Sequence, residues 1–526
     1  MTAPRASAAA PPDHFGDDPA ATGLDPGFCL PRRILHWARL DPERPFMIEV
    51  GGRGTTYAGF VDGMLRWCTL LREMGIVPGE RVVSFLPPSI DAYQLWLACA
   101  CIGAWEVPVN PELRGEFLHH VLADAGARWC FARPSEAGLA QAGGMPDLRT
   151  VVVDCRRPPA APHAPARIDA YPGPGDVACV IYTSGTTGPA KGVMVHWGQL
   201  AATVGRIPRG WLSERDVAFA PWPMFHVTGR TPMFSMTDVG GRLVVREKFS
   251  LGEFWNDVRV HGVTTTTLAA IQNLIAAQAP SPADREHGLR IAFGGVAGAH
   301  NLAFQDRFGV RLVLSYGSTE LGFAMVNRIH DAAAAQRTGW LRPGYAARIV
   351  DSQGRDCADG EAGELWVRPP APELMMRGYL NRPEATAAAI VDGWYRTGDA
   401  MIRDPDGGFR FVDRMKDTIR RMGENISSTA MEAVVARDPE VGDCCVVGVP
   451  SAIAGQEVVL SVSPAAGAAL DPAALYARLQ PLLPRYMWPS WIAVVEDFPR
   501  TPSGKIRKVD VRAGLDLGRA WPAPRR

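Results

Sequence analysis

Residues 183–192 (TSGTTGPAKG) combine hydroxyl groups, glycines and one lysine in a short segment. Gly185 and Gly188 permit positive φ angles and a close approach of the backbone to an anion. Lys191 can add a positive charge to such a site. The hydroxyl groups that can join the backbone N–H groups in holding phosphate oxygens belong to Thr183, Ser184, Thr186 and Thr187. This composition predicts a phosphate-binding loop.

The segment differs from the phosphate loop of enzymes that transfer a γ-phosphoryl group. The spacing from Gly185 to Lys191 fits the pattern GxxxxGK[ST], but Ala190 stands where the second glycine belongs. Gly192 follows the lysine at the position where a hydroxyl should bind magnesium. Both departures argue against ordinary γ-phosphoryl transfer.

An apolar run at 177–182 (VACVIY) precedes the loop and is typical of a strand covered on both faces. Further upstream, short apolar strands alternate with helices, which predicts parallel strands joined by crossover helices. The predicted strands are 81–86, 106–109, 127–131 and 151–154, and the predicted helices are 91–102 and 116–125. We therefore expect an α/β fold with parallel or mixed sheets wrapped by helices.

The length of 526 residues suggests more than one domain. Residues 1–28 lack the apolar region of a secretory signal and are predicted to be a disordered leader. We expect a large N-terminal domain at 29–412, a hinge at 413–417 and a small α+β domain at 418–526. Helices near 429–437 and 471–483 and strands at 444–449 and 457–463 are predicted for the small domain.

Composition excludes several classes of partner. Lys plus Arg equals Asp plus Glu at 55 each, so charge gives no reason to expect nucleic acid or an anionic membrane. The ten cysteines show no metal-binding spacing, which is typical of reduced thiols in a cytoplasmic protein. The most apolar stretch, 95–105, is too short to span a bilayer. These features indicate no particular oligomeric state.

Five segments resemble, in order, the signature motifs of the adenylate-forming superfamily, which includes acyl-CoA synthetases, firefly luciferase and peptide-synthetase adenylation domains. They are 182–192 (YTSGTTGPAKG), 315–320 (SYGSTE), 395–399 (YRTGD), 413–427 (DRMKDTIRRMGENIS) and 499–508 (PRTPSGKIRK). The similarity covers nearly the whole chain after residue 30. Residues 413–427 are most similar to bacterial carnitine/crotonobetaine-type acyl-CoA ligases.

The resemblance implies an AMP-forming acid–thiol ligase that uses ATP, Mg²⁺ and CoA on a small-molecule acid. A carboxylate is a poor electrophile because it is already an anion. In the first step the acid oxygen would attack the α-phosphorus of ATP and expel pyrophosphate; the CoA thiol would then take the acyl group. Because two anions must approach each other, the site needs cations and oriented dipoles.

The resemblance also implies roles for residues outside the phosphate loop. Lys505, on a mobile small domain, would bridge the acid and the α-phosphate. Asp399 follows a glycine, so its carboxylate can accept hydrogen bonds from both ribose hydroxyls, with Arg414 as a second ribose or phosphate contact. Glu320 would hold Mg²⁺ through its oxygens. The remaining implied nucleotide contacts are Tyr316 against adenine, Gly317 beside it and Thr319 at the α-phosphate.

A further set of residues is implied for acyl transfer. His226 resembles the gate between the acid pocket and the thiol tunnel. Lys416 occupies the hinge about which the small domain would rotate after adenylation. That rotation would withdraw Lys505 and bring another face, including Gly423, to the thiol channel. Ala430 departs from the family pattern, because it stands where the first Glu of a Glu-x-Glu sequence is usual.

The expected acid pocket has mostly small or moderately apolar residues, which suggests a modest apolar or aryl acid. No aspartate follows His226 closely, so an α-amino acid is not expected. The implied pocket residues are Phe225, Val227, Thr228, Gly294, Gly295 and Ser318.

Two alternatives stay open. One is an adenylating enzyme with another acceptor: a carrier-protein thiol, an amine or water, including a diazotase that activates nitrite for an aryl amine. The other is a catalytically silent nucleotide-binding protein. Intact Lys191, Glu320, Asp399 and Lys505 argue against the second alternative.

Overall fold

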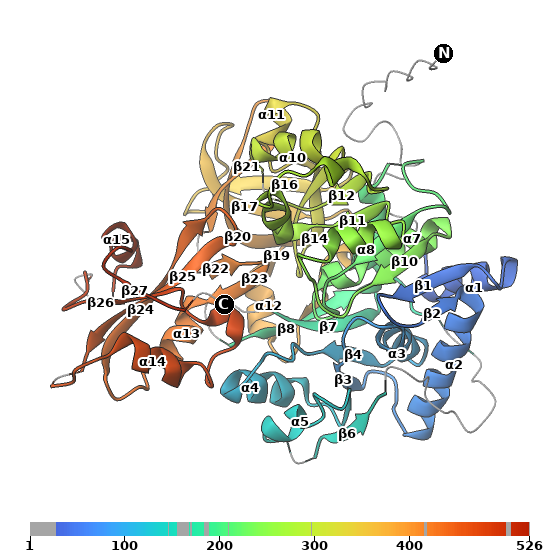
Figure 1. Ribbon diagram of the computed structural model, residues 1–526, viewed down its shortest axis with the longest axis horizontal. Coiled ribbons are helices and arrows are strands. Elements are labelled where there is room, and N and C mark those ends of the chain that lie inside the picture. Colours follow the sequence, from blue (N-terminus) through green and yellow to red (C-terminus); the bar gives the residue numbers. More distant parts are fainter. Residues whose placement is uncertain are drawn as a thin grey trace.

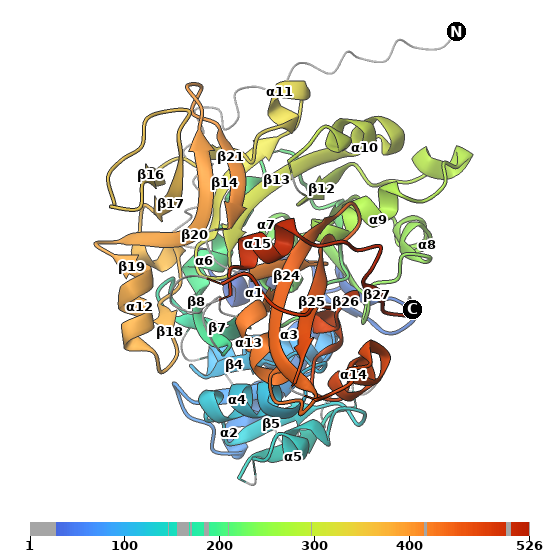
Figure 2. The ribbon, with the colours of Figure 1, turned by 90° about the vertical axis from the view of Figure 1, so that its left-hand side faces the viewer.

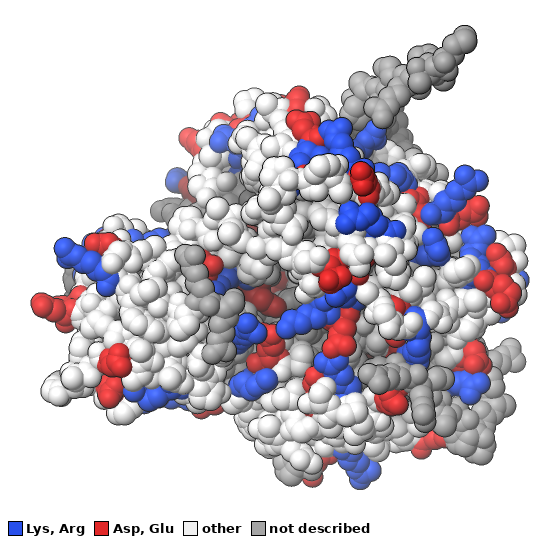
Figure 3. All heavy atoms as spheres, in the orientation of Figure 1, with Lys and Arg blue, Asp and Glu red and all other residues white. Residues whose placement is uncertain are grey.

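The computed structural model shows two large sheets with helices between and outside them, and a smaller domain at one side (Figures 1 and 2). It describes residues 28–145, 147–154, 168, 171–183, 189–208, 210–295, 297–414, 418–465, 467–500 and 506–524. Within these residues no helix is both long enough and apolar enough to cross a membrane. Acidic and basic side chains are intermixed on the face that Figure 3 shows.

The first large sheet has nine strands in the spatial order β15-β14-β13-β12-β11-β9-β10-β1-β2. Its core strands, from β13 to β1, are parallel, and hairpin pairings close both edges. The bounds are β1 Pro45–Glu49, β2 Gly54–Thr56, β9 Val217–Ala220, β10 Arg242–Val245, β11 Thr265–Thr267, β12 Ile291–Phe293, β13 Arg311–Ser318, β14 Gly322–Arg328 and β15 Trp340–Leu341.

The second large sheet has seven strands in the order β18-β8-β7-β4-β3-β5-β6. The five strands from β7 to β6 are parallel, as the alternation of strands and helices predicts. Strand β8 returns antiparallel to β7 after the phosphate loop. The bounds are β3 Arg81–Phe85, β4 Trp105–Pro108, β5 Trp129–Ala132, β6 Arg149–Val152, β7 Val177–Thr183, β8 Lys191–His196 and β18 Gly378–Tyr379.

Helices between the two sheets form the main core with the inner faces of both. All residues of α3 are buried, which explains why its sequence is apolar around its whole circumference. The inner helices are α1 Leu30–Leu40, α2 Tyr57–Glu73, α3 Ile90–Cys101, α6 Trp197–Ala201 and α7 Thr231–Val239. Separate apolar clusters hold the outer helices: α8 Phe254–Val260, α9 Gln272–Ala276, α10 His300–Phe308 and α11 Ala332–Ala335 on the nine-stranded sheet, and α4 Gly115–Ala125 and α5 Leu139–Ala142 on the other.

Two smaller sheets follow in the chain. The third contains β16 Ala346–Val350, β17 Ala362–Arg368, β19 Ile390–Val391, β20 Trp394–Arg403 and β21 Phe409–Arg414, with α12 Pro383–Ala389 packed beside it. The fourth contains β22 Thr418–Arg421, β23 Glu424–Ser427, β24 Val441–Ser451, β25 Gly455–Pro464, β26 Trp491–Val494 and β27 Trp521–Pro522, with α13 Ser428–Val435, α14 Pro472–Leu479 and α15 Lys508–Ala513. The fourth sheet and its three helices form a small α+β unit at the C-terminal end of the chain, as the sequence predicts.

The fourth sheet buries a different apolar cluster on each face. One face packs against α13 and α14 and reaches Phe117 of α4 in the large domain. The opposite face packs against Val511 of α15, with Phe498 and Ile506 beside it. Helix α15 therefore lies on the side of the small domain that points away from the large domain (Figures 1 and 2).

A buried ion pair joins the two large sheets at the start of α7. Arg230 is fully buried and donates from Nη2 to Glu106 Oε2 of β4 at 2.6 Å. Ser84 of β3 donates to the other carboxylate oxygen at 2.7 Å. Arg230 Nε also donates to the carbonyl of Met224 at 2.9 Å. The pair thus fixes the loop that carries His226 against the second sheet.

We expect Glu106→Gln to lower the free energy of unfolding of the large domain by about 3 kcal/mol, because the Arg230 charge would stay buried without a counter-charge. Denaturant unfolding followed by circular dichroism measures this change. The matched control is Asp62→Asn, which removes an exposed ion pair with Arg66 and should cost less than about 1 kcal/mol. Equal losses in the two variants would contradict the role of the buried pair.

Candidate active site

A central cavity of about 820 Å³ opens where the carboxyl ends of β7, β9, β11 and β13 meet strand β20. This is where open α/β sheets generally bind ligands, because the loops after parallel strands converge at one edge. The residues predicted from the sequence that line this cavity are Thr183, Lys191, His226, Val227, Thr228, Tyr316, Gly317, Ser318, Thr319, Glu320, Asp399 and Gly423. Residues from four separate sequence motifs therefore meet in one volume.

One end of the central cavity carries a lysine and a carboxylate. Lys191 pairs with Thr183 across the β7–β8 hairpin, and its Nζ lies 5.0 Å from the centroid of the Tyr379 ring. The Thr183 and Tyr379 hydroxyls donate to Glu320 Oε1 at 3.4 and 3.2 Å. Burial and the Glu320 carboxylate raise the pKa of Tyr379, so its phenol stays a hydrogen-bond donor. This arrangement suits a polyphosphate with a divalent cation.

A tyrosine and a carboxylate adjoin this end. The Tyr316 hydroxyl donates to Asp399 Oδ2 at 2.7 Å, and Asp399 is 6% exposed. Gly398, just before the aspartate, has a φ of 69°, which places the aspartate after a sharp change in chain direction. The backbone of Arg414 lies opposite Asp399 in the β20–β21 pairing. The predicted adenine and ribose contacts are therefore neighbours in space.

The small domain inserts a tight hairpin into the central cavity. Strands β22 and β23 are joined by Met422 and Gly423, whose φ angles are 51° and 89°. Positive φ at both positions defines a type I′ turn, which matches the twist of the flanking strands. A methionine adopts this conformation at a cost in conformational energy, so the surrounding structure must impose it. The turn brings Gly423 and Glu424 to the cavity wall.

His226 and Glu424 make a direct contact between the two domains. His226 Nε2 lies 2.9 Å from Glu424 Oε1, and the side chains are 31% and 24% exposed. Burial alone would lower the pKa of His226, but the Glu424 carboxylate outweighs it and raises the pKa above its usual value. The contact is therefore strongest when His226 is protonated.

The part of the cavity beyond His226 has apolar and small residues. Val227, Thr228 and Ser318 line it, as predicted, together with Ala269 and Phe323. These residues come from the loop after β9, the ends of β11 and β13, and strand β14.

The glycine turn predicted for the acid pocket lies behind this wall. Gly294 and Gly295 have φ angles of 94° and 117°, and a Cβ atom on Gly295 would lie 2.2 Å from Gln272 Oε1. Only glycine fits this turn, which shapes the chain between β12 and the cavity. The two glycines do not themselves contribute to the cavity lining.

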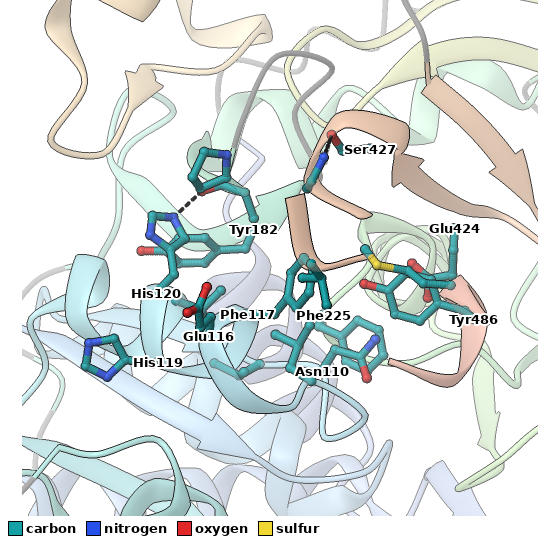
Figure 4. Close-up of a pocket in the computed structure, with 18 of the residues that line it drawn as sticks. Asn110, Glu116, Phe117, His119, His120, Tyr182, Phe225, Glu424, Ser427 and Tyr486 are labelled. Atoms are coloured by element: carbon teal, nitrogen blue, oxygen red, sulfur yellow. Dashed lines mark hydrogen bonds between the residues drawn. The ribbon is translucent and has the colours of Figure 1, made fainter. Parts of the chain in front are cut away.

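A second, interdomain cavity of about 640 Å³ lies between α4 of the large domain and α13 of the small domain (Figure 4). It meets the central cavity at Tyr182, His226 and Glu424. Phe225, predicted for the acid pocket, lines this second cavity instead of the central one. Ala430, the departure noted in the sequence, contributes a methyl group to its largely apolar wall.

Several predicted site residues lie outside the described residues: Ser184, Gly185, Thr186, Thr187, Gly188, Lys416 and Lys505. The described neighbours of the C-terminal lysine segment are Arg500 and Ile506, which pair with each other. Ile506 packs against the outer face of the small domain. For Arg414 the description covers the backbone only.

Tyr379, Glu364 and Glu424 are among the cavity residues that were not identified from the sequence. Tyr379 follows Gly378 on the edge strand β18, and no sequence motif marks it. Glu364 lies on β17 and accepts a hydrogen bond from the Gly398 backbone at 3.2 Å. Glu424 directly follows Gly423 in the 413–427 motif. This position next to a predicted channel residue could have indicated that Glu424 also lines the cavity.

The fold and the cavity define an α/β enzyme with a large nucleotide-binding domain and a small C-terminal domain. Residues 34–380 match the family described as AMP-binding enzyme, and residues 430–505 match its AMP-binding enzyme C-terminal domain. The chain belongs to the AMP-binding enzyme family. Family membership confirms the resemblance seen in the sequence and the predicted class, an AMP-forming ligase.

Curated relatives align along almost their whole length. The chain is 29% identical to the crotonobetaine/carnitine–CoA ligase of Salmonella paratyphi A, covering 88% of this chain and 93% of the relative. It is 30% identical to the sulfoacetate–CoA ligase of Cupriavidus necator, covering 91% and 95%. Among solved structures, the amide bond synthetase from Marinactinospora thermotolerans is 28% identical with a TM-score of 0.81, covering 92% and 99%.

Two structures of one neighbour differ in their match to this chain. A double mutant of o-succinylbenzoate CoA synthetase from Bacillus subtilis, bound with a product analogue, gives a TM-score of 0.82 at 23% identity, covering 91% and 98%. The complex of that synthetase with its acyl-adenylate intermediate gives 0.66 at 24% identity, covering 91% and 97%. Both structures share the overall fold of this chain.

We expect the docked arrangement of the domains to weaken as pH rises. A raised His226 pKa contributes stability that is fully present below the ordinary histidine pKa and is lost as pH rises through the raised value. Because the His226–Glu424 pair is partly exposed, the equilibrium constant for docking of the small domain should fall by about twofold to fivefold. Energy transfer between one dye on each domain, recorded from acid to alkaline pH, measures the docked fraction.

Glu424→Gln should lower the docked fraction at acid pH and flatten its pH dependence, because an amide does not attract the protonated imidazole. His36→Gln is the matched control, since His36 is an exposed histidine on α1 of the large domain and lines neither cavity. An unchanged pH profile in Glu424→Gln would show that another group controls docking.

Proposed function

We propose that the chain is an acid–CoA ligase that forms an acyl-adenylate from ATP and then passes the acyl group to CoA. One observation carries this proposal: two cavities, one lined by phosphate- and ribose-type contacts and one largely apolar, meet at His226 and Glu424. An enzyme with two successive half-reactions needs a junction of this kind, because the same acyl carbon must meet first the nucleotide and then the thiol.

In the first half-reaction ATP would occupy the end of the central cavity between Lys191 and Asp399. The carboxylate of Asp399 would accept hydrogen bonds from the ribose hydroxyls, and the ring of Tyr316, anchored through its hydroxyl, would lie against adenine. Lys191 would draw off charge from the departing pyrophosphate. The acid oxygen attacks the α-phosphorus, and the bond from that phosphorus to the β-phosphate bridge oxygen breaks.

A magnesium ion fits the donor set at the phosphate end. Glu320 offers carboxylate oxygens to the cavity, and magnesium usually takes one or two carboxylates together with phosphate oxygens and water. The ion would neutralise charge on the polyphosphate. Thr183 and Tyr379 orient Glu320 for this role through their hydrogen bonds.

In the second half-reaction the interdomain cavity would admit the thiol. Its apolar lining suits the long, largely uncharged arm that carries a CoA thiol, and it ends at His226. The thiol sulfur attacks the acyl carbon, AMP leaves, and the thiol proton passes to solvent or to a nearby base. The curated relatives are named as CoA ligases, which supports this acceptor. ATP and CoA are cytoplasmic metabolites, so we place the reaction in the cytoplasm.

The two half-reactions would use two arrangements of the small domain. Here Gly423 and Glu424 face the cavities, while Ile506, the residue that follows Lys505 in the sequence, packs against the outer face. For Lys505 to reach the α-phosphate, the small domain would have to rotate about Lys416. The predicted hinge, 413–417, covers the end of β21 and the three positions between β21 and β22 in the sequence, and we propose that the rotation takes place there.

An amine acceptor is the second candidate, because the amide bond synthetase has the same fold and its match covers 92% of this chain. The interdomain cavity would then receive an amine in place of the thiol. Both candidates share the adenylation step and differ in the final bond.

Product analysis tests the proposed function. Incubation with ATP, Mg²⁺ and a panel of acids, with and without CoA, should give AMP and pyrophosphate, and with CoA a thioester visible by mass spectrometry. ADP with phosphate would overturn the adenylation mechanism. Pyrophosphate release that CoA does not affect, with no thioester, would favour the amine acceptor.

We expect Lys505→Ala to slow adenylation by at least about 100-fold, because it removes the charge that would stabilise the transition state at the α-phosphate. Thioester formation from a supplied acyl-AMP should change less than about threefold. Arg507→Ala is the matched control: it removes a neighbouring exposed cation that pairs with Asp510, and both rates should stay close to those of the unmodified enzyme. Loss of both half-reactions in Lys505→Ala would contradict the two-arrangement scheme.

A further inference from the structure

Arg206 is a buried cation that lies behind Phe323, a residue of the central cavity wall. It ends the short 3-10 helix η2 Val204–Arg206 and is 4% exposed. Its Nε donates to the carbonyl of Thr203 at 3.0 Å. Its guanidinium carbon lies 4.1 Å from the ring centroid of Phe323 and 5.3 Å from that of Phe293. Two aromatic faces therefore hold the guanidinium in place.

No acidic side chain of the described residues pairs with Arg206, and its two terminal amino groups have no hydrogen-bond partner there. The charged group that acts on it is another cation, Arg342, which is 1% exposed and donates to the carbonyls of Phe323 and Ala202. Burial and Arg342 lower the pKa of Arg206 to about 9. The buried Arg230, in contrast, has Glu106 as its counter-ion.

The position of this cation connects it to the acid pocket. Phe323 lines the central cavity beside Val227, Thr228 and Ala269. Phe293 is the last residue of β12 and leads into the glycine turn that the sequence predicts for the acid pocket. The guanidinium is thus one aromatic ring away from the space beyond His226.

A buried charge without a counter-charge is costly, and proteins keep one where a ligand supplies the opposite charge. We propose that the activated acid carries a second anionic group, and that Arg206 binds this group at the far end of the acid pocket. The planar guanidinium presents two free amino groups, a geometry that matches a carboxylate, sulfonate or phosphonate. This inference rests on the proposed acid activation and adds a substrate class to it.

The proposed role of Arg206 favours an acid with a second charged group over a purely apolar acid. The walls formed by Val227, Thr228 and Phe323 would hold the carbon skeleton, while the carboxylate that reacts would point toward the nucleotide. Arg206 would then select acids by the charge at their other end and thus act as a specificity-determining residue.

The test measures AMP formation with pairs of acids that differ in one charge. The pairs are succinate and monomethyl succinate, sulfoacetate and methylsulfonylacetate, and terephthalate and its monomethyl ester, with phosphonoacetate as a further dianion. In at least one pair, kcat/KM should be about 10- to 100-fold higher for the dianion, the range expected for hydrogen bonds to a charged group. The pairs distinguish carboxylate from sulfonate recognition and compare two lengths of acid. Phosphonoacetate tests recognition of a phosphonate.

Variants of Arg206 test whether the preference for dianions comes from this side chain. Arg206→Met should reduce the ratio of kcat/KM between dianion and monoanion to near one, while Arg206→Lys should keep part of it because it retains the charge. Arg311→Gln is the control: Arg311 is an exposed arginine that stacks on Trp211 outside the cavity, and the ratio should not change. Calorimetric titration of the unmodified enzyme with the same dianions gives a readout independent of turnover and of variant folding.

The outcomes separate this inference from the proposed function. AMP formation with the monoanions alone would overturn the inference and leave the acid activation intact. Arg206-dependent binding of a dianion without any AMP formation would support the anion site and overturn the proposed function. A charge preference that survives in Arg206→Met would assign the second anion to another group, and a protein that binds no dianion would show that Arg206 only packs against the two aromatic rings.

Discussion

The buried pair between Arg230 and Glu106 is the contact on which the site depends. It ties the loop after β9 in one large sheet to β4 of the other. Removing two charges from water is costly, and the cost is offset only where geometry and further hydrogen bonds are good, as with the donation from Ser84. The result is a fixed position for His226 at the point where the two cavities meet.

This fixed histidine gives the small domain a defined docking point. The hairpin between β22 and β23 reaches the junction only because Met422 and Gly423 both accept positive φ, so that the strands stay twisted while the tip stays narrow. The opposite face of the same domain carries α15 and the described neighbours of the lysine segment. Under the proposed rotation, one small domain would offer two different surfaces to one cavity with little internal change.

The residues that line the end of the cavity around Lys191 and Asp399 could be located from the sequence because they lie in short contiguous motifs. Tyr316 to Glu320 end one strand, Thr183 and Lys191 flank one loop, and Asp399 follows one glycine. The alternation of strands and helices likewise predicted the parallel core of the second sheet. Phe225 lines the interdomain cavity together with its neighbour His226, and its part in the acid pocket stays a prediction.

The residues around the acid pocket are not contiguous in the sequence. Their charge and their partners could therefore be recognised only in the tertiary structure. The walls of the acid pocket come from the loop after β9, from the residue after β11 and from β14, which are far apart in the sequence, and η2 lies behind β14. An arginine in the run GRIPRG has no local feature that marks it as buried, and its lack of a counter-charge is a property of everything packed around it. Relatives of this chain are named for different acids, so family membership fixes the activation chemistry but not the acid. Selection among acids must then come from side chains such as Arg206 that change one charge at the far wall and leave the phosphate end unaltered.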